Sequence, residues 1–190
     1  GGIQTTASHN PIQYNGFKFS RMEAKPIGMG TGLELIQAYA EEDDGSGEPV
    51  GGESSMDLWE QYKAHVHRFL HPDLLSGKRT MKVVIDASNG MAGTFMPKVF
   101  GDVPGLDMTE INYENDKGMF VHEPNPLVEA NLRQVRDGVV SEKAQVGICF
   151  DGDADRCMVV DELGTPVGCD LLTAWLAEGF IKDDPGASIV

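Results

Sequence analysis

The sequence has few basic residues, few cysteines and no long apolar run. Its 190 residues include 15 Lys and Arg against 30 Asp and Glu, which gives a formal net charge of −15. This balance argues against general nucleic-acid binding, which needs a basic footprint, and against docking on anionic membranes. It leaves room for an anionic small-molecule substrate, because a local basic site can lie within an acidic protein.

Three cysteines do not make a disulfide framework, so a reducing cytoplasm is the simplest compartment. No stretch approaches 18 consecutive apolar residues, and we therefore expect no membrane-spanning helix. The two ends, residues 1–3 and 187–190, read as strands that are cut short. We therefore expect a piece of a larger protein, whose oligomeric state the sequence does not decide.

Apolar periodicity predicts strands that alternate with helices. The expected strands are 16–19, 81–86, 107–112, 145–150 and 158–161, and the expected helices are 31–41, 58–70, 94–100, 127–139 and 170–181. This alternation predicts an α/β fold with a mixed, mainly parallel sheet and flanking helices. In such sheets ligands lie beyond the carboxyl ends of the strands, where Asp86 and the segment after residue 150 are placed.

An acidic, glycine-rich segment at residues 41–55 indicates a loop or linker between two parts of the chain. We expect boundaries near it, with one part at residues 1–53 and a second at 54–165. A third part, residues 166–190, begins after the hairpin turn that follows the last expected strand.

Three aspartates at alternate positions, Asp151, Asp153 and Asp155, follow the strand expected at 145–150. Their mutual repulsion raises the cost of ionisation unless a cation neutralises them, and hard oxygen ligands favour Mg²⁺ or Ca²⁺. Arg156 suits an anionic group, such as a phosphate, bound beside the metal. The segment therefore predicts a metal site that works on a phosphate, with a solvated acidic turn as the structural alternative.

A calcium-binding EF-hand is a competing interpretation, because Glu162 stands at position 12 counted from Asp151. Position 6 of such a loop is glycine, whereas here it is Arg156. The flanking segments also read as strands rather than helices. We therefore favour a metal loop at the end of a strand.

The segment Thr6–Pro11 is a polar loop rich in turn-forming residues. Ser8 within it is a candidate nucleophile or phosphorylation acceptor, but a serine hydroxyl needs activation. Lys18 is a candidate for moving a proton, provided that its surroundings lower its pKa. On these residues alone an ordinary turn is the simpler interpretation, and His9 reads as a hydrogen-bonded structural residue.

Taken together, TASHNP at 6–11, NGFK at 15–18 and DGDADR at 151–156 resemble the α-D-phosphohexomutase superfamily. This superfamily includes phosphoglucomutases, phosphomannomutases and phosphoglucosamine mutases. The resemblance covers essentially the whole chain, including the DASNGMAG turn at 86–93. It implies that the three parts are the C-terminal remnant of mutase domain 1, the whole of domain 2 and the start of domain 3.

The resemblance implies an isomerase that interconverts hexose 1-phosphate and hexose 6-phosphate through a hexose 1,6-bisphosphate. Ser8 would carry the phosphoryl group in the active enzyme. One Mg²⁺ would be held by Asp151, Asp153 and Asp155 together with an oxygen on Ser8. The hexose phosphate would be the substrate, and the hexose 1,6-bisphosphate would act as activator.

The resemblance also implies roles for four other residues around the transferred group. Lys18 matches the lysine that exchanges a proton with the sugar hydroxyl, and Arg156 matches the arginine that meets the phosphoryl group. His9 and Asn10 match residues of the active loop, Asn10 on the phosphate-binding side.

The sequence departs from the family pattern in three ways. It has no GExSG-type sugar-reading loop of domain 3, because GESS at 52–55 lies in the wrong region, and it lacks the phosphate-binding loop of domain 4. Ala154 replaces the more usual glycine of the metal loop. We therefore expect the chain alone to be a poor mutase, and the preferred hexose stays open.

Two other functions fit the same residues. A metal-dependent, phosphatase-like hydrolase would use the aspartates to direct attack by water and would release inorganic phosphate. A non-catalytic remnant would bind Mg²⁺ but would never phosphorylate Ser8.

Overall fold

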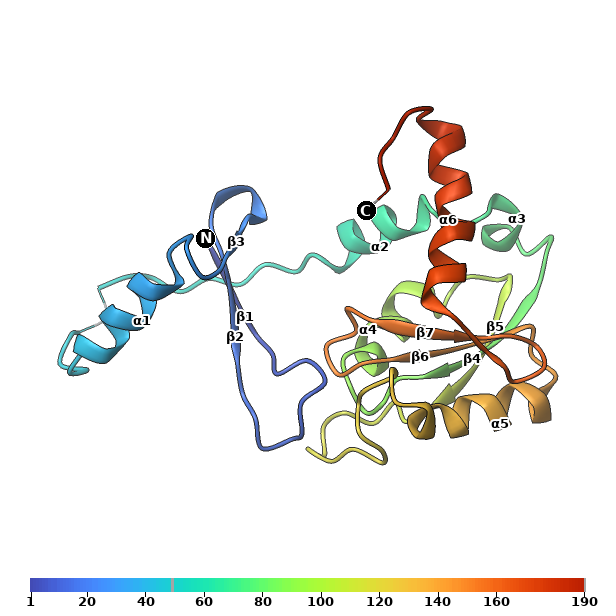
Figure 1. The fold of residues 1–190 in the computed structure, drawn as a ribbon, viewed down its shortest axis with the longest axis horizontal. Coiled ribbons are helices and arrows are strands. Elements are labelled where there is room, and N and C mark those ends of the chain that lie inside the picture. The colour runs from blue at the N-terminus through green and yellow to red at the C-terminus, as the bar shows by residue number, and fades with distance from the viewer. Residues whose placement is uncertain (49, 190) are drawn as a thin grey trace.

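The structure, a computed structural model, describes residues 1–48 and 50–189. An extended N-terminal arm, which ends near residue 58, leads into an α/β body (Figure 1). The last helix, α6 (Cys169–Asp183), rises from the body and carries the chain away from its sheet. Residues 187–189 are not in a strand, so the strand expected at 187–190 is not formed there, and Val190 lies outside the described residues.

The arm holds a small antiparallel sheet in the order β1 (Gly2–Thr5), β2 (Phe17–Ser20) and β3 (Pro26–Ile27). A short 3-10 helix, η1 (Met22–Ala24), joins β2 to β3, and α1 (Leu33–Glu42) follows. These elements agree with the strand expected at 16–19 and the helix expected at 31–41.

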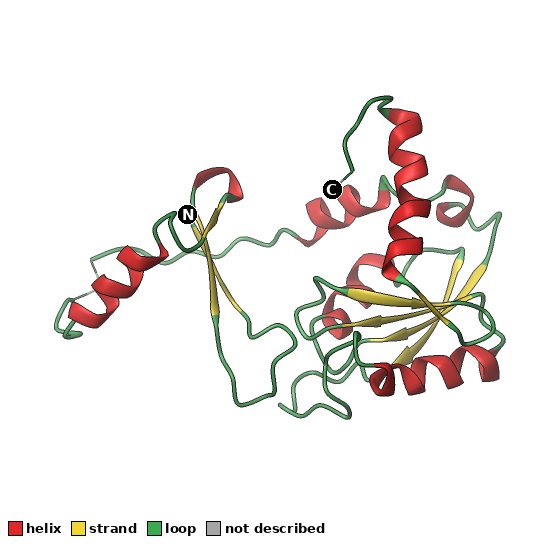
Figure 2. Cartoon of the chain, viewed as in Figure 1, coloured by secondary structure: helices red, strands yellow, loops and turns green. Residues whose placement is uncertain are grey.

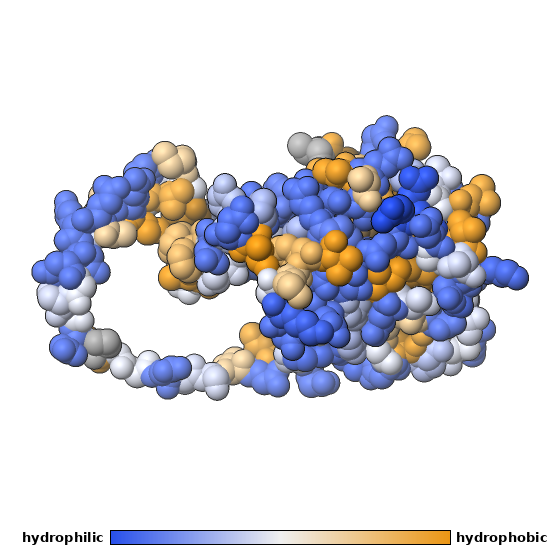
Figure 3. Space-filling model, turned by 90° about the horizontal axis from the view of Figure 1, so that it is seen from below, coloured by the Kyte–Doolittle hydropathy of each residue, from blue (hydrophilic) through white to orange (hydrophobic). Residues whose placement is uncertain are grey.

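The loop that joins β1 to β2, residues 6–16, projects from the arm toward the body (Figure 2). This Ser8 loop contacts the body, and so does Lys18 of the adjoining strand β2. The arm buries little else, because α1 has no buried residue and Ile3 and Phe17 are both more than half exposed. Figure 3 shows apolar side chains on the surface of the arm as well as on the body.

The body is built on a five-stranded sheet in the order β5-β4-β6-β7-β8. Its strands are β4 (Met81–Asp86), β5 (Leu106–Ile111), β6 (Val146–Phe150), β7 (Cys157–Val160) and β8 (Pro166–Val167). The pairs of β4 with β5 and with β6 are parallel, whereas β7 and β8 are antiparallel to their neighbours. The expected mixed α/β fold is confirmed, with only half of the pairings parallel, because the short loop at 151–156 can only return the chain antiparallel.

Helices cover both faces of this sheet (Figure 2). They are α4 (Ala92–Phe100) on one face and α5 (Arg133–Glu142), preceded by the 3-10 helix η2 (Glu129–Leu132), on the other. Before β4, α2 (Trp59–His67) packs against α4 and is followed by the short α3 (Pro72–Leu75). Val84, Val135 and Val139 form the core on the α5 side, while Ile85 and Met96 belong to the core on the α4 side. In the described part of the chain, no helix combines the length and apolarity needed to cross a membrane.

Gly93 in α4 lies where no side chain fits, and this makes a testable contrast with Gly179 in α6. A Cβ at Gly93 would lie 2.2 Å from the carbonyl oxygen of Tyr113, whereas a Cβ at Gly179 would meet nothing within 4 Å. We expect Gly93→Ala to lower the free energy of unfolding by about 2 kcal/mol through overpacking. Gly179→Ala should raise it by up to about 1 kcal/mol, through helix propensity alone.

Urea unfolding monitored by circular dichroism measures both changes. Equal effects of the two substitutions would contradict the close approach of α4 to Tyr113.

The carboxyl ends of β4 and β6 lie at the same edge of the sheet, because these strands are adjacent and parallel. Asp86 ends β4 opposite Cys149, and Asp151 follows β6 directly. The Ser8 loop meets the body at this edge. The topology therefore brings the two motifs of the sequence together.

Candidate functional site

The Ser8 loop is closed by its own hydrogen bonds. The backbone N–H of Thr6 donates to the carbonyl of Gly16 at 2.9 Å, and the side-chain amide of Asn10 donates to the carbonyl of Ala7 at 2.9 Å. Ser8 has a φ of +53°, a left-handed conformation that is rare for a residue with a side chain. The loop therefore presents Ser8 in a constrained turn, in which the Asn10 amide is used within the loop.

The hydroxyl of Ser8 lies between an acid and a base of the body. It donates to Oδ2 of Asp151 at 3.1 Å and accepts from Nη2 of Arg156 at 2.9 Å. Nδ1 of His9 is 3.3 Å from the same oxygen. Three of the predicted site residues thus contact the Ser8 oxygen, although two of them lie more than 140 positions away in the sequence.

Residues 151–156, which we call the metal loop, approach the backbone of the Ser8 loop closely. A Cβ on Gly152 would lie 2.2 Å from the carbonyl oxygen of Ser8, so glycine is required there. The carbonyl of Gly152 accepts from the backbone N–H of Met91 at 2.9 Å. The metal loop is therefore held between the Ser8 loop and the start of α4.

The three aspartates of the metal loop point into one small volume. Oxygens of Asp151, Asp153 and Asp155 lie within 4.8 Å of one another. Oδ1 of Asp153 is buried and has no hydrogen-bond partner among the described residues. A buried carboxylate oxygen without a donor is costly unless a cation meets it, and an all-oxygen donor set suits Mg²⁺. The residues therefore fit the predicted metal.

The ammonium group of Lys18 neutralises part of this cluster. Its Nζ lies 2.9 Å from an oxygen of Asp155 and 2.9 Å from one of Asp153. The hydrogen bonds to Asp155 and then Asp153 raise the pKa of Lys18. This is opposite to the lowered pKa that proton acceptance requires, so Lys18 is here a protonated donor.

The aspartates themselves divide into two environments. Burial raises the pKa of Asp151, whose side chain is wholly inaccessible to solvent. Burial also disfavours the charged form of Asp153, but hydrogen bonds from Lys18 and Thr6 outweigh it and lower the pKa of that carboxyl. Asp153 is thus the more firmly ionised of the two.

Replacing Lys18 by methionine should strengthen cation binding at the cluster. The change removes an ammonium group that is paired with two of the three carboxylates, so a divalent ion would no longer compete with it for those carboxylates. We expect about a tenfold gain in affinity for Mn²⁺, used as a spectroscopic probe, in a titration followed by electron paramagnetic resonance. Lys25→Met is the control, because Lys25 pairs only with the exposed Glu23 in the arm. A weaker affinity in Lys18→Met would show that Lys18 supports the ion rather than competes with it.

Thr6 is a site residue that the sequence analysis did not identify. Its Oγ1 donates to Oδ2 of Asp153 at 2.7 Å and accepts from the backbone N–H of Ser8 at 2.9 Å. One side chain therefore links the Ser8 loop to the metal loop. Thr6 lies two residues before Ser8, and this spacing is typical of a serine/threonine turn. That spacing is the sequence feature from which its role could have been predicted.

Ala154, which stands where the family more usually has glycine, adopts a backbone conformation that favours glycine. It has a φ of +61°, in the left-handed region that glycine adopts at little cost. The metal loop keeps this conformation with alanine, at a cost of about 1 kcal/mol.

A buried ion pair lies behind the metal loop. Nε2 of His122 is 3.0 Å from Oδ2 of Asp86, which is completely buried, and Nδ1 of His122 is 2.9 Å from the carbonyl of Glu123. Both ring nitrogens face acceptors, so the ring carries both protons. The hydrogen bond to Asp86 raises the pKa of His122, although burial opposes this.

This raised pKa predicts how stability depends on pH. Because the pKa of His122 is higher in the folded state, its contribution is complete below the unfolded value of about 6.5 and is lost as pH rises through the folded pKa. We expect the stability difference between the unmodified chain and His122→Gln to shrink as pH rises above about 6.5. Urea unfolding at a series of pH values measures it, and a constant difference would show that His122 does not titrate in this range.

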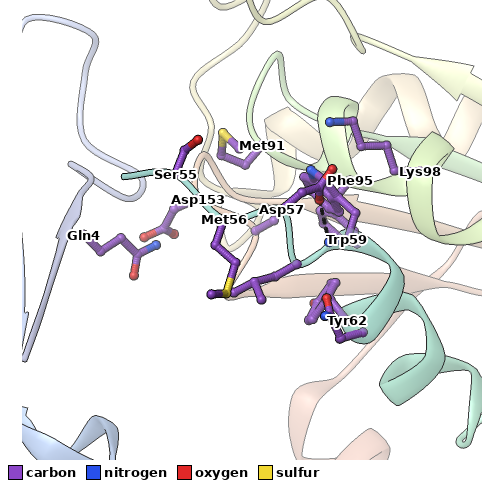
Figure 4. A pocket seen from close by; sticks show the side chains of 13 residues that line it. Gln4, Ser55, Met56, Asp57, Trp59, Tyr62, Met91, Phe95, Lys98 and Asp153 are labelled. Carbon is purple, nitrogen blue, oxygen red and sulfur yellow. Dashed lines mark hydrogen bonds between the residues drawn. The ribbon is translucent and has the colours of Figure 1, made fainter. Parts of the chain in front are cut away.

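Two cavities flank the Ser8 oxygen and the aspartates. One of about 390 Å³ is lined by Thr6, Ser8, Phe120 and Asp153 among others. A second of about 1010 Å³ lies between β1, the segment before α2, and α4 (Figure 4). Asp153 lines both cavities, and in the larger one the amine of Lys98 lies 4.3 Å from the centre of the Trp59 ring. The smaller cavity is the one that Ser8 faces.

Comparison with known proteins matches two family profiles. "Phosphoglucomutase/phosphomannomutase, alpha/beta/alpha domain II" matches residues 60–164, and the corresponding domain I matches residues 1–46. The Vibrio cholerae phosphomannomutase is 35% identical over the whole chain, and Xanthomonas campestris phosphohexose mutases are 32% identical. The chain covers 42% of the length of each of these relatives.

Solved structures show the same likeness. A phosphoglucomutase/phosphomannomutase family protein from Burkholderia thailandensis has a TM-score of 0.78 and 30% identity, over 97% of this chain and 38% of its own. A putative phosphomannomutase from Thermus thermophilus has a TM-score of 0.76 and 27% identity, over 97% of this chain and 41% of its own. The matched profile for domain II alone spans more than half of the sequence. With both loops in contact at the sheet edge, this chain belongs to the phosphoglucomutase/phosphomannomutase family.

Proposed function

We propose that this chain supplies the phosphoserine loop and the metal loop of an enzyme that interconverts hexose 1-phosphate and hexose 6-phosphate. The observation that carries the proposal is the position of the Ser8 hydroxyl, between Asp151 and Arg156 and beside the aspartate cluster. In domain terms, residues 1–53 are the end of mutase domain 1, residues 54–165 are domain 2, and residues 166–190 begin domain 3.

Ser8 is the group that takes up and returns the phosphoryl group in this proposal. Its hydroxyl already donates to Asp151, whose buried carboxylate can accept that proton as the new phosphorus–oxygen bond forms. Arg156 donates to the same oxygen and would hold the phosphoryl group placed there. His9 lies on the other side of Ser8 and helps to orient it.

The metal and the lysine complete the proposed machinery. Asp151, Asp153 and Asp155, together with an oxygen on Ser8, would hold one Mg²⁺, which supplies neutralisation of the charge on the phosphoryl group when it is bound. Protonated Lys18 would give a proton to the sugar oxygen that leaves the phosphoryl group. In the reverse transfer the same amine takes the proton back from the sugar hydroxyl.

The substrate is a hexose phosphate, and a hexose 1,6-bisphosphate is the intermediate and the activator that loads Ser8. The cavity of about 390 Å³ beside Ser8 is in the range of small-molecule sites, and the basic groups of Lys18 and Arg156 lie at the cluster in an otherwise acidic chain. Asn10 would contribute to phosphate binding through its loop rather than through its amide, which is bonded to Ala7. The cytoplasmic location stays a prediction from the composition.

The experiment is a phosphorus NMR assay of the full-length protein that carries this segment. It is incubated with glucose or mannose 1-phosphate, Mg²⁺ and a trace of the matching 1,6-bisphosphate. The appearance of hexose 6-phosphate supports the mutase. Release of inorganic phosphate without isomerisation would favour the hydrolase, and no turnover in a chain that binds Mg²⁺ would favour the binding remnant. The 190-residue chain alone should turn over poorly, since it covers 42% of the length of the relatives named above.

A further inference from the structure

A buried polar network lies behind the metal loop, and none of its members contacts the Ser8 oxygen. Its centre is Asp86, which is completely buried at the end of β4. Oδ1 of Asp86 accepts from the backbone N–H of Ser88 at 2.9 Å and from the side-chain amide of Asn112 at 3.0 Å. Oδ2 accepts from His122 at 3.0 Å. Both oxygens of this buried carboxylate therefore accept hydrogen bonds, from Ser88, Asn112 and His122.

The segment that follows Asp86 is hydrogen-bonded to the metal loop and to the residue before it. The hydroxyl of Ser88 donates to the carbonyl of Phe150, the residue just before Asp151, at 2.6 Å. Three residues further, the backbone N–H of Met91 donates to the carbonyl of Gly152 at 2.9 Å. The entry and the first turn of the metal loop are thus both bonded to the turn that Asp86 anchors.

His122 fixes a second segment against the same loop. The residues after it include Pro124, whose side chain is fully buried and lies 3.7 Å from where a Cβ on Gly152 would be. Just before it, the backbone N–H of Val121 donates to the side-chain oxygen of Asn89 at 2.9 Å. The bond from His122 to Asp86 therefore joins two segments, each of which contacts the metal loop.

We propose that Asp86 and His122 are positioning residues that set the shape of the metal loop, and with it the affinity for the divalent cation. This inference rests on the metal site of the proposed function. Groups that orient metal ligands from behind change metal affinity by about 10–100-fold when they are removed. The Asp86–His122 pair acts in this way through Ser88, Met91 and Pro124.

The test is a Mn²⁺ titration of the 190-residue chain, followed by electron paramagnetic resonance of the free ion. His122→Leu keeps the bulk but removes both hydrogen bonds, and we expect it to weaken Mn²⁺ binding by about tenfold or more. His122→Gln keeps a donor near the position of Nε2, so it should restore affinity to within about threefold of the unmodified chain. This rescue separates the hydrogen bond to Asp86 from the packing of the ring.

Val139→Ala is the matched control for stability. Val139 is completely buried in the core beneath α5, and its loss should lower the melting temperature while leaving Mn²⁺ affinity within about twofold. A folded His122→Leu chain with unchanged affinity would overturn the inference. So would a loss in Val139→Ala as large as that in His122→Leu, since affinity would then follow stability alone.

A second variant serves if His122→Leu does not fold. Ser88→Gly leaves the Asp86–His122 pair in place and suits the φ of +49° at this position, but removes the hydroxyl bonded to Phe150. We expect it to weaken Mn²⁺ binding by about threefold to tenfold, and unchanged affinity would overturn the proposal.

A failure of the proposed metal site can be distinguished from a failure of this inference alone. If the unmodified chain binds no Mn²⁺, the metal site and this inference fall together. If the unmodified chain binds Mn²⁺ and Asp153→Asn does not, the metal site stands, and the His122 and Ser88 variants alone decide the inference.

Discussion

Ser8→Ala should abolish uptake of a phosphoryl group by the full-length protein. After incubation with glucose 1,6-bisphosphate and Mg²⁺, the unmodified protein should gain the mass of one phosphoryl group, and the variant should gain none. The reason is local, because both Arg156 and Asp151 contact the Ser8 oxygen, which is the nucleophile in the proposed function. Mutase activity should fall by about a thousandfold or more, since removal of a nucleophile takes away the intermediate itself.

Intact-mass spectrometry of both proteins measures the increment. Ser141→Ala is the control, because Ser141 is an exposed serine of α5 whose hydroxyl is bonded only to the carbonyl of Gly138. It should keep the full increment. A mass increment that persists in Ser8→Ala would place the phosphoryl group on another residue. If the unmodified protein binds Mg²⁺ but shows no increment, the hydrolase or the non-catalytic binding remnant is favoured instead.

Asp153→Asn should remove most of the stabilisation that a divalent cation gives to the folded chain. A ligand present at a hundred times its dissociation constant stabilises the folded state by about 2.7 kcal/mol. For a chain of this length that corresponds to a rise in melting temperature of about 5–10 °C. Asp153 carries the buried oxygen that lacks a donor among the described residues, so its loss should cost the cluster a ligand that is more firmly ionised than Asp151.

Differential scanning calorimetry with and without Mg²⁺ measures this shift. Glu162→Gln is the matched control, because Glu162 is exposed in the turn after β7 and would be a ligand only in an EF-hand. Mg²⁺ should raise the melting temperature of Glu162→Gln as much as that of the unmodified chain. A shift that survives in Asp153→Asn would show that the ion binds elsewhere.

The sequence by itself determined the kind of fold and predicted a metal site at the end of a strand. Apolar runs that end in acids predicted β4 and β6 and placed Asp86 and Asp151 at strand ends, because strand periodicity and burial are local properties of the chain. The residue types of the segment that begins at Asp151 predicted phosphate and metal chemistry, whereas the loop around Ser8 gained a functional interpretation only from the family resemblance. The family resemblance rested on these same short segments, and the comparisons confirmed it.

The tertiary structure decided what depends on contacts between distant residues. The short metal loop turned β7 antiparallel, and the loop between β1 and β2 reached the body so that Ser8 met Asp151 across 143 positions. The pKa of Lys18 rises rather than falls, because two carboxylates from another part of the chain surround its amine.

The hydrogen bonds of Asp86 and His122 behind the metal loop also depend on contacts between distant residues. The bond between Asp86 and His122 joins residues 36 positions apart, and no local pattern marks either one as the partner of the other. Local sequence sets turn and strand preferences over a few residues, whereas hydrogen bonds and charge pairs at this distance exist only once the sheet has brought its strand ends together.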